Sequence, residues 1–102
     1  MIISDQVKAQ VKKNALLNTN EEVCGIVCQN KVIPLKNLSQ NPKYHFYISP
    51  LILIENNIDC IYHSHVMSTC QPSKCDIAFQ KQLAIPFLIY GIHDDEFYFL
   101  NN

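Results

Sequence analysis

The hydrophobic residues near the start of the chain recur every four positions. They are Ile3, Val7, Val11 and Ala15. This spacing places them on one face of an amphipathic helix, and Ser4 is a favourable N-cap just ahead of it. The pattern therefore predicts a helix over about residues 4–17.

Beyond residue 20 the apolar residues come in short runs separated by turn residues, which is typical of strands. Such runs predict strands over residues 21–28, 31–36, 43–48, 59–65, 86–92 and 96–100. Gln29-Asn30 is a tight turn that would join the first two as a hairpin, and Pro34 favours an edge position or a bulge. In the third run, alternation predicts that Tyr44, Phe46 and Ile48 face the same way.

Two further helices are predicted between the strands. Ser49-Pro50 provides an N-cap followed by proline at the first helical position, which predicts a short helix to Asn57. Another would open at Ser73 and run to about Gln82. Strands interleaved with three helices predict an α/β fold, in which a mixed sheet is flanked by helices.

Length and charge narrow the classes of function. At 102 residues the chain is expected to form a single domain over 1–102. Its net charge is −1 and all eight basic residues are lysine, which argues against nucleic acid or an anionic membrane as a partner. The apolar run Leu51–Ile54 is far too short to span a membrane. The N-terminus lacks the pattern of a signal peptide, so we expect a cytoplasmic protein with reduced cysteines.

Two histidines one residue apart are the strongest chemical signal in the chain. His63 and His65 follow a strand-like run, and side chains two apart on a strand share a face. Asp76 lies eleven positions further on. Two imidazoles and a carboxylate are a usual ligand set for a catalytic zinc, with the fourth position left to water. Ser73-x-x-Asp76 at a helix start is also close to a capping box. The Asp76 carboxylate therefore has two possible roles, as a helix cap and as a metal ligand.

The spacing His63-x-His65-x7-Ser73-x2-Asp76 resembles the signature of the JAMM (MPN+) metallopeptidases. That family also has a glutamate in an upstream strand, and Glu22 stands at the matching place. The resemblance implies a cytidine-deaminase-like sheet. It also implies Zn²⁺ held by His63, His65 and Asp76, with Glu22 as general base and Ser73 as hydrogen-bond donor to the oxyanion.

Glu21 is a second candidate for the general base, next to Glu22 in the sequence. A glutamate at the head of an apolar strand is costly to bury without a function. Glu21 is the fallback for the base, although it is out of register with the family pattern. His45 and His93 lie outside the pattern, and we expect surface or local structural roles for them.

The five cysteines leave another ligand set open. Cys24, Cys28 and Cys60 fall in apolar strands and are expected in the core. Cys70 and Cys75 flank the loop after the histidines, so a site of two histidines and one cysteine is an alternative. A nucleobase deaminase would need H-x-E and then P-C-x-x-C, and this chain has neither.

The resemblance implies hydrolysis of a peptide or isopeptide bond in a protein or peptide substrate. Val66 stands where most relatives have proline. The chain leaves little room for the insertions with which deubiquitinating relatives hold ubiquitin, which favours the compact bacterial and phage branch. A substrate in phage tail assembly or a ubiquitin-like protein is therefore expected, in the host cytoplasm if the gene is a phage's. The alternative is a non-enzymatic, zinc-stabilised binding module for such a partner.

Overall fold

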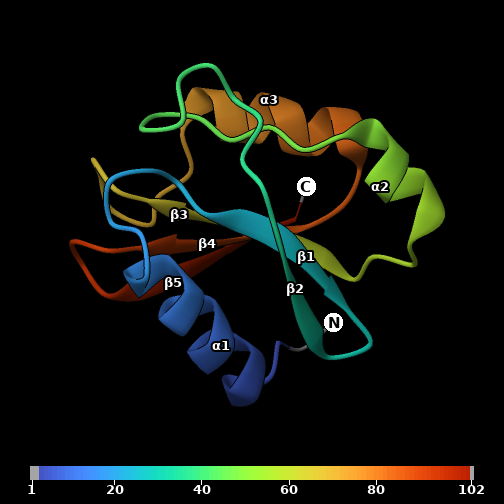
Figure 1. Ribbon diagram of the computed structural model, residues 1–102, viewed down its shortest axis with the longest axis horizontal. Coiled ribbons are helices and arrows are strands. Elements are labelled where there is room, and N and C mark those ends of the chain that lie inside the picture. The colour runs from blue at the N-terminus through green and yellow to red at the C-terminus, as the bar shows by residue number, and fades with distance from the viewer. Residues whose placement is uncertain (1–2, 102) are drawn as a thin grey trace.

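The computed structural model describes residues 3–101, which form three helices and five strands (Figure 1). In chain order they are α1 (Asp5–Leu16), β1 (Cys24–Cys28), β2 (Lys31–Leu35), α2 (Pro50–Glu55), β3 (Cys60–His65), α3 (Lys74–Leu83), β4 (Phe87–Gly91) and β5 (Glu96–Leu100). Among these residues, no helix is long and apolar enough to cross a membrane.

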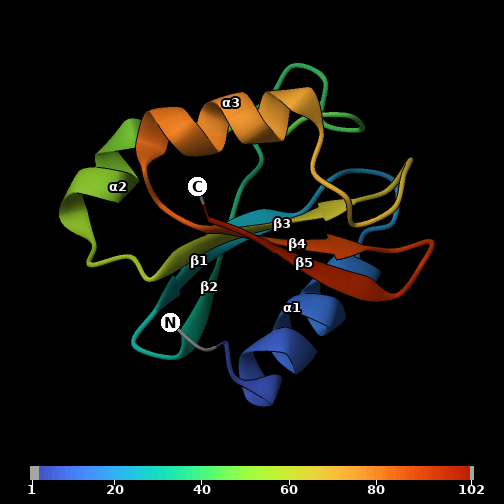
Figure 2. The ribbon, with the colours of Figure 1, turned by 180° about the vertical axis from the view of Figure 1, so that it is seen from behind.

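The strands form one mixed sheet in the order β2-β1-β3-β4-β5. β3 and β4 are parallel, whereas the other neighbours are antiparallel. The parallel pair needs a crossover, which α3 supplies. α1 covers one face of the sheet, and α2 and α3 lie on the other (Figures 1 and 2). The predicted mixed sheet flanked by helices is confirmed.

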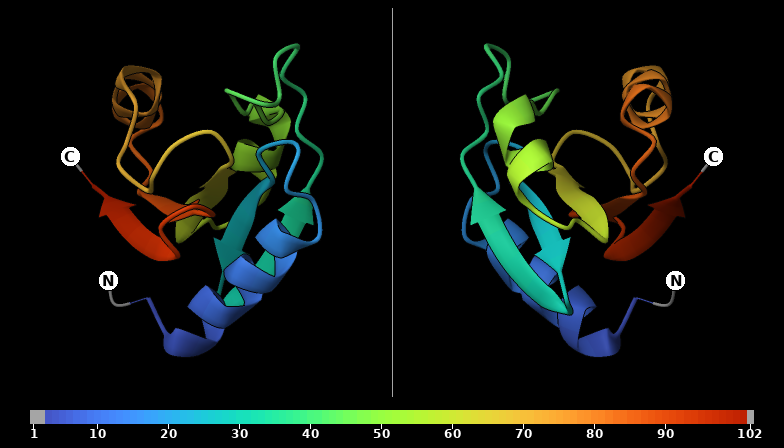
Figure 3. Two further views of the ribbon diagram at one scale, coloured as in Figure 1. Left: turned by 90° about the vertical axis from the view of Figure 1, so that its left-hand side faces the viewer. Right: turned by 90° about the vertical axis from the view of Figure 1, so that its right-hand side faces the viewer.

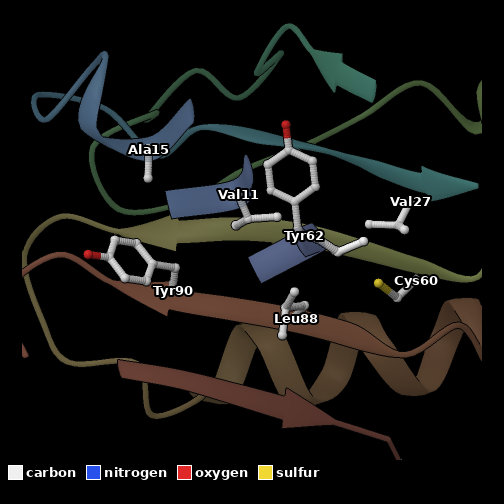
Figure 4. Close-up of a cluster of buried hydrophobic side chains, with 8 residues drawn as sticks. Val11, Ala15, Val27, Cys60, Tyr62, Leu88 and Tyr90 are labelled. Atoms are coloured by element: carbon white, nitrogen blue, oxygen red, sulfur yellow. The ribbon is translucent and has the colours of Figure 1, made fainter. Parts of the chain in front are cut away.

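The face under α1 holds the first of two apolar cores. The buried α1 residues Val7, Val11 and Ala15 are the ones that the four-residue spacing selects. They pack in one cluster with Tyr62 and Tyr90 of the sheet (Figure 4). The Ser4 hydroxyl accepts a hydrogen bond from the Val7 N–H at 3.1 Å, which confirms the predicted N-cap.

The hairpin between β1 and β2 is a two-residue turn, as predicted. Gln29 and Asn30 both have positive φ, at 51° and 65°, which matches the twist of a tight hairpin. β2 is an edge strand of the sheet, so the edge position predicted from Pro34 is confirmed.

The predicted strand over residues 43–48 is wrong, because this segment is irregular. Phe46 and Ile48 are buried as the alternation predicts, whereas Tyr44 is 53% exposed. The side chain of Asn37 replaces a neighbouring strand: its Nδ2 donates to His45 O and its Oδ1 accepts from Tyr47 N. The segment therefore crosses above the sheet beside α3 (Figure 3).

Candidate metal centre

His63 and His65 are the last side chains of β3 on the α3 face of the sheet. The exposed fractions of the two residues are 0% and 4%, so both imidazoles are out of water. Phe46 stacks on the His63 ring with centroids 4.2 Å apart, and Phe87 meets the ring edge-on at 5.7 Å. The irregular segment and β4 thus form apolar walls around the pair.

Asp76 projects from the first turn of α3 onto both imidazoles. Its Oδ1 lies 3.0 Å from His63 Nε2, and its Oδ2 lies 2.9 Å from His65 Nε2. The capping box is also formed, since Oδ2 accepts from Ser73 N and Ser73 Oγ accepts from Asp76 N. One carboxylate therefore caps the helix and faces both histidines, and its role as a metal ligand stays a prediction.

Glu22 reaches the same place from the residues just before β1. The predicted strand began at residue 21, whereas β1 begins at Cys24. Glu22 is 5% exposed, and its backbone is held by Pro42 O and by the side chain of Asn37. Ligating atoms of Glu22, His63 and His65 lie within 4.8 Å of one another. Glu21, the fallback for the base, is exposed.

Burial and mutual charge shift the titration of these groups. Burial raises the pKa of Glu22 to about 8, partly opposed by His65 and reinforced by Asp76. Burial lowers the pKa of His63 by more than the Asp76 carboxylate raises it. Burial also acts on His65, but hydrogen bonds with Asp76 and with the Thr69 carbonyl raise its pKa overall. The pKa of Asp76 is lowered, because the two imidazoles outweigh its burial.

The unpaired nitrogens of His63 are consistent with a cation at this site. Its Nε2 approaches Asp76 without the alignment of a hydrogen bond, and its Nδ1 has no partner within residues 3–101. A buried imidazole without hydrogen bonds is costly. A metal ion bound by an Nε2 lone pair, beside Glu22 and His65, would remove part of that cost. The residues present therefore fit a divalent cation.

A groove of about 700 Å³ leads up to this group. It lies between the 45–50 segment and α3, with Asp76 in its lining. Phe46, Phe79 and Leu83 make much of the wall apolar. Ser73 is exposed at the start of α3, and its hydroxyl hydrogen can still donate while its oxygen serves the cap.

One of the three cysteines expected in the core lies at its edge. Cys24 and Cys60 are in the core as predicted, whereas Cys28 is only half-buried. Cys70 is buried with its N–H donating to Asp94 Oδ2, and Cys75 is exposed at the groove. Among the described residues, the closely spaced group of Glu22, His63 and His65 includes no cysteine, so nothing in it supports a ligand set of two histidines and a cysteine.

Two supporting groups could not be predicted from the motif. Phe46, which stacks on His63, belongs to a segment whose path depends on Asn37. The Thr69 carbonyl, 2.7 Å from His65 Nδ1, is a backbone group, and every residue type has one, so the sequence could not indicate its role. His45 is exposed, and His93 donates from Nε2 to Val66 O, which are the surface and local structural roles expected.

No family model matches this sequence. Among proteins of known role, it is similar to the tail tip assembly protein K of Escherichia phage N15. The two are 36% identical over 76 residues, which is 67% of this chain and 31% of the phage protein. The chain thus spans about a third of the length of that relative.

Two solved structures share the fold. A JAB1/MPN domain protein from Archaeoglobus fulgidus superimposes with a TM-score of 0.69 at 17% identity, covering 99% of this chain and 89% of that one. The chain is similar in fold to a JAB1/MPN domain. A protein from Desulfitobacterium hafniense has a TM-score of 0.59 at 21% identity, covering 88% of this chain and 77% of that one. The predicted fold class is thereby confirmed, and the zinc peptidase activity stays a prediction.

Proposed function

We propose that this chain is a zinc-dependent peptidase domain that hydrolyses a peptide or isopeptide bond. The observation that carries the proposal is the buried group of Glu22, His63 and His65, with Asp76 on both imidazoles. A purely structural site would need neither a buried glutamate beside its ligands nor a groove leading up to them.

The ligands that we assign to zinc are His63, His65 and Asp76. Imidazole nitrogen and carboxylate oxygen are the donors that catalytic zinc prefers, with one position left open. Zinc bound there supplies Lewis-acid chemistry, by activating water and polarising a carbonyl.

Glu22 is the group that we assign to proton transfer. In the metal-free site, burial raises its pKa to about 8, and a neighbouring cation would favour the carboxylate and lower that value. Its carboxylate takes a proton from the attacking water and delivers it to the leaving amine nitrogen, which releases the new amino terminus. Because Glu22 is nearly shielded from solvent, the proton passes to the leaving group more readily than to bulk water.

Ser73 is assigned to the oxyanion. Its hydroxyl hydrogen is available because the oxygen accepts the capping hydrogen bond from Asp76 N. A donor to an oxyanion contributes roughly 3 kcal/mol to the stability of the transition state. We therefore expect Ser73→Ala to lower kcat by about 100-fold.

The groove points to a polypeptide substrate. Its volume of about 700 Å³ and its walls of Phe46, Phe79 and Leu83 suit apolar side chains of an extended peptide. The name of the phage relative supports a role in tail-tip assembly. The substrate that we propose is a tail protein or a ubiquitin-like protein.

The test is cleavage of a diverse peptide mixture by the zinc-loaded chain, read by mass spectrometry. Wild type is expected to generate new termini, and Glu22→Gln is expected to bind zinc without generating them. Glu21→Gln is the matched control, since this exposed neighbour should leave cleavage unchanged. Wild type that cleaves no more than Glu22→Gln would contradict the peptidase, and tight zinc with loss of stability on chelation would then favour the binding module.

A further inference from the structure

The two ring nitrogens of His65 face different partners, and the Ser68 hydroxyl lies 3.4 Å from Nδ1 beside the nearer of them. Nε2 faces Asp76 at 2.9 Å, and Nδ1 faces the Thr69 carbonyl at 2.7 Å. A carbonyl oxygen only accepts hydrogen bonds, so Nδ1 must carry a proton. Without a metal, the Asp76 carboxylate also attracts a proton to Nε2, and a cation that takes the place of that proton would bind the Nε2 lone pair while Nδ1 keeps its proton.

The position of the Thr69 carbonyl depends on a loop that packs only at its ends. β3 ends at His65, and in the loop that follows, Val66 and Cys70 are buried whereas Thr69 is exposed. His93 Nε2 donates to Val66 O at 2.8 Å, and Cys70 N donates to Asp94 Oδ2 at 3.2 Å. Two adjacent residues of the β4–β5 turn therefore hold both ends of the loop.

Gly91 shows how closely the turn approaches this loop. A Cβ at this position would lie 2.5 Å from Cys70 N and 2.9 Å from Thr69 C, so the backbone of the loop would have to shift to admit one. The neighbouring Ile92 N–H donates to His65 O at 3.1 Å. The end of β4 and the turn after it therefore contact the backbone at His65 and at Thr69, whose carbonyl faces the His65 ring.

We propose that His93 and Asp94 are positioning residues that hold the Val66–Cys70 loop, and through the Thr69 carbonyl fix the His65 ring with Nε2 toward the metal. The proposal rests on the proposed function in one respect, because it takes His65 as a metal ligand. Neither residue touches the metal or the substrate. Partners that orient a ligating histidine typically contribute 10- to 100-fold to metal affinity, so we expect effects of about that size.

Asp95 provides a control within the same turn. Its Oδ1 accepts hydrogen bonds from Tyr90 OH at 2.6 Å and from Lys12 Nζ at 2.9 Å, on the α1 side of the sheet. Removing its side chain should destabilise the turn without changing the loop over His65. Asp95→Ala therefore separates loss of stability from loss of positioning.

The first measurement is zinc affinity, by competition with a chromogenic chelator. Asp94→Ala is expected to bind zinc about 10-fold more weakly than wild type or worse. Asp94→Asn should stay within about threefold of wild type, because its amide oxygen still accepts from Cys70 N. Asp95→Ala should bind like wild type. If Asp94→Ala does not fold, His93→Ala is the second variant, with His93→Gln as its rescue. Equal affinity in the Ala and Asn variants at position 94, or an equal loss in Asp95→Ala, would overturn the proposal.

The second measurement needs no metal. Nitrogen-15 NMR of the imidazoles at pH 8 reports which ring nitrogen of His65 carries the proton. Wild type, Asp94→Asn and Asp95→Ala should show a protonated Nδ1, whereas Asp94→Ala should gain the form with a bare Nδ1. An unchanged Nδ1 signal in Asp94→Ala would refute the positioning role. Wild type that binds no zinc would contradict the proposed peptidase function. The NMR result would still test whether His93 and Asp94 position the His65 ring, because it needs no metal.

Discussion

Replacing Glu22 by glutamine should change how the stability of the metal-free protein depends on pH. The pKa of Glu22 is raised from 4.5 to about 8 in the folded chain, mainly because burial penalises the carboxylate. The folded state therefore keeps a proton that the unfolded state releases near pH 4.5, so stability is present at low pH and is lost as pH rises to 8. Each pH unit between these values costs about 1.4 kcal/mol, which gives a total on the order of 5 kcal/mol between pH 4.5 and pH 8, most of it above pH 5.

The assay is urea unfolding of wild type and Glu22→Gln between pH 5 and pH 8, with a chelator present. Glutamine does not titrate, so the variant should lack this loss. The free energy of unfolding of wild type minus that of the variant should fall by about 4 kcal/mol over the range. His65, with a raised pKa, also loses stability as pH rises, whereas His63 and Asp76, with lowered pKa values, lose it as pH falls. These groups are present in both proteins and cancel to first order.

Parallel pH profiles for the two proteins would refute this reasoning, since they would mean that Glu22 ionises in the folded state as it does in the unfolded chain. Zinc provides an internal check. A bound cation favours the carboxylate, so saturating zinc should flatten the difference between the two profiles.

Three further substitutions test the site and the sheet that supports it. Asp76→Asn should weaken zinc binding by at least about 100-fold in a chelator competition, and it should also lower the melting temperature of the metal-free protein, because it removes the charge that faces both imidazoles even though the amide oxygen still serves the cap. Phe46→Ala should lower the free energy of unfolding by about 3 kcal/mol in urea, because it removes the buried ring that stacks on His63. Gly25→Ala should cost about 3 kcal/mol in the same assay, since its Cβ would come within 2.4 Å of both Ile33 O and the Tyr62 ring. A variant as stable as wild type would contradict the close approach of β2 and of the Tyr62 ring to Gly25.

Local rules explain why much of the fold could be predicted. The four-residue spacing selects the buried side of α1, and the Ser4 cap forms where expected. The period of a strand puts His63 and His65 on one face. The proximity of Asp76 to both imidazoles rested on the likeness of the motif to a family, because no local rule connects a helix start with the end of a strand.

The rest of the site depends on long-range contacts that cannot be predicted from the identity of the residues alone. Residues 43–48 alternate like a strand, and Phe46 and Ile48 are buried accordingly. Alternation reports burial and not hydrogen bonding, and here Asn37 supplies the hydrogen bonds that a strand would have provided. The Thr69 carbonyl and its support by Asp94 are likewise set by how the loop and the turn meet.

The metal centre is tested most simply by elemental analysis of the purified protein, with wild type beside His65→Ala. We predict about one zinc per chain in wild type and its loss in the variant. Wild type that contains no metal after incubation with zinc would contradict the metal centre and, with it, the peptidase.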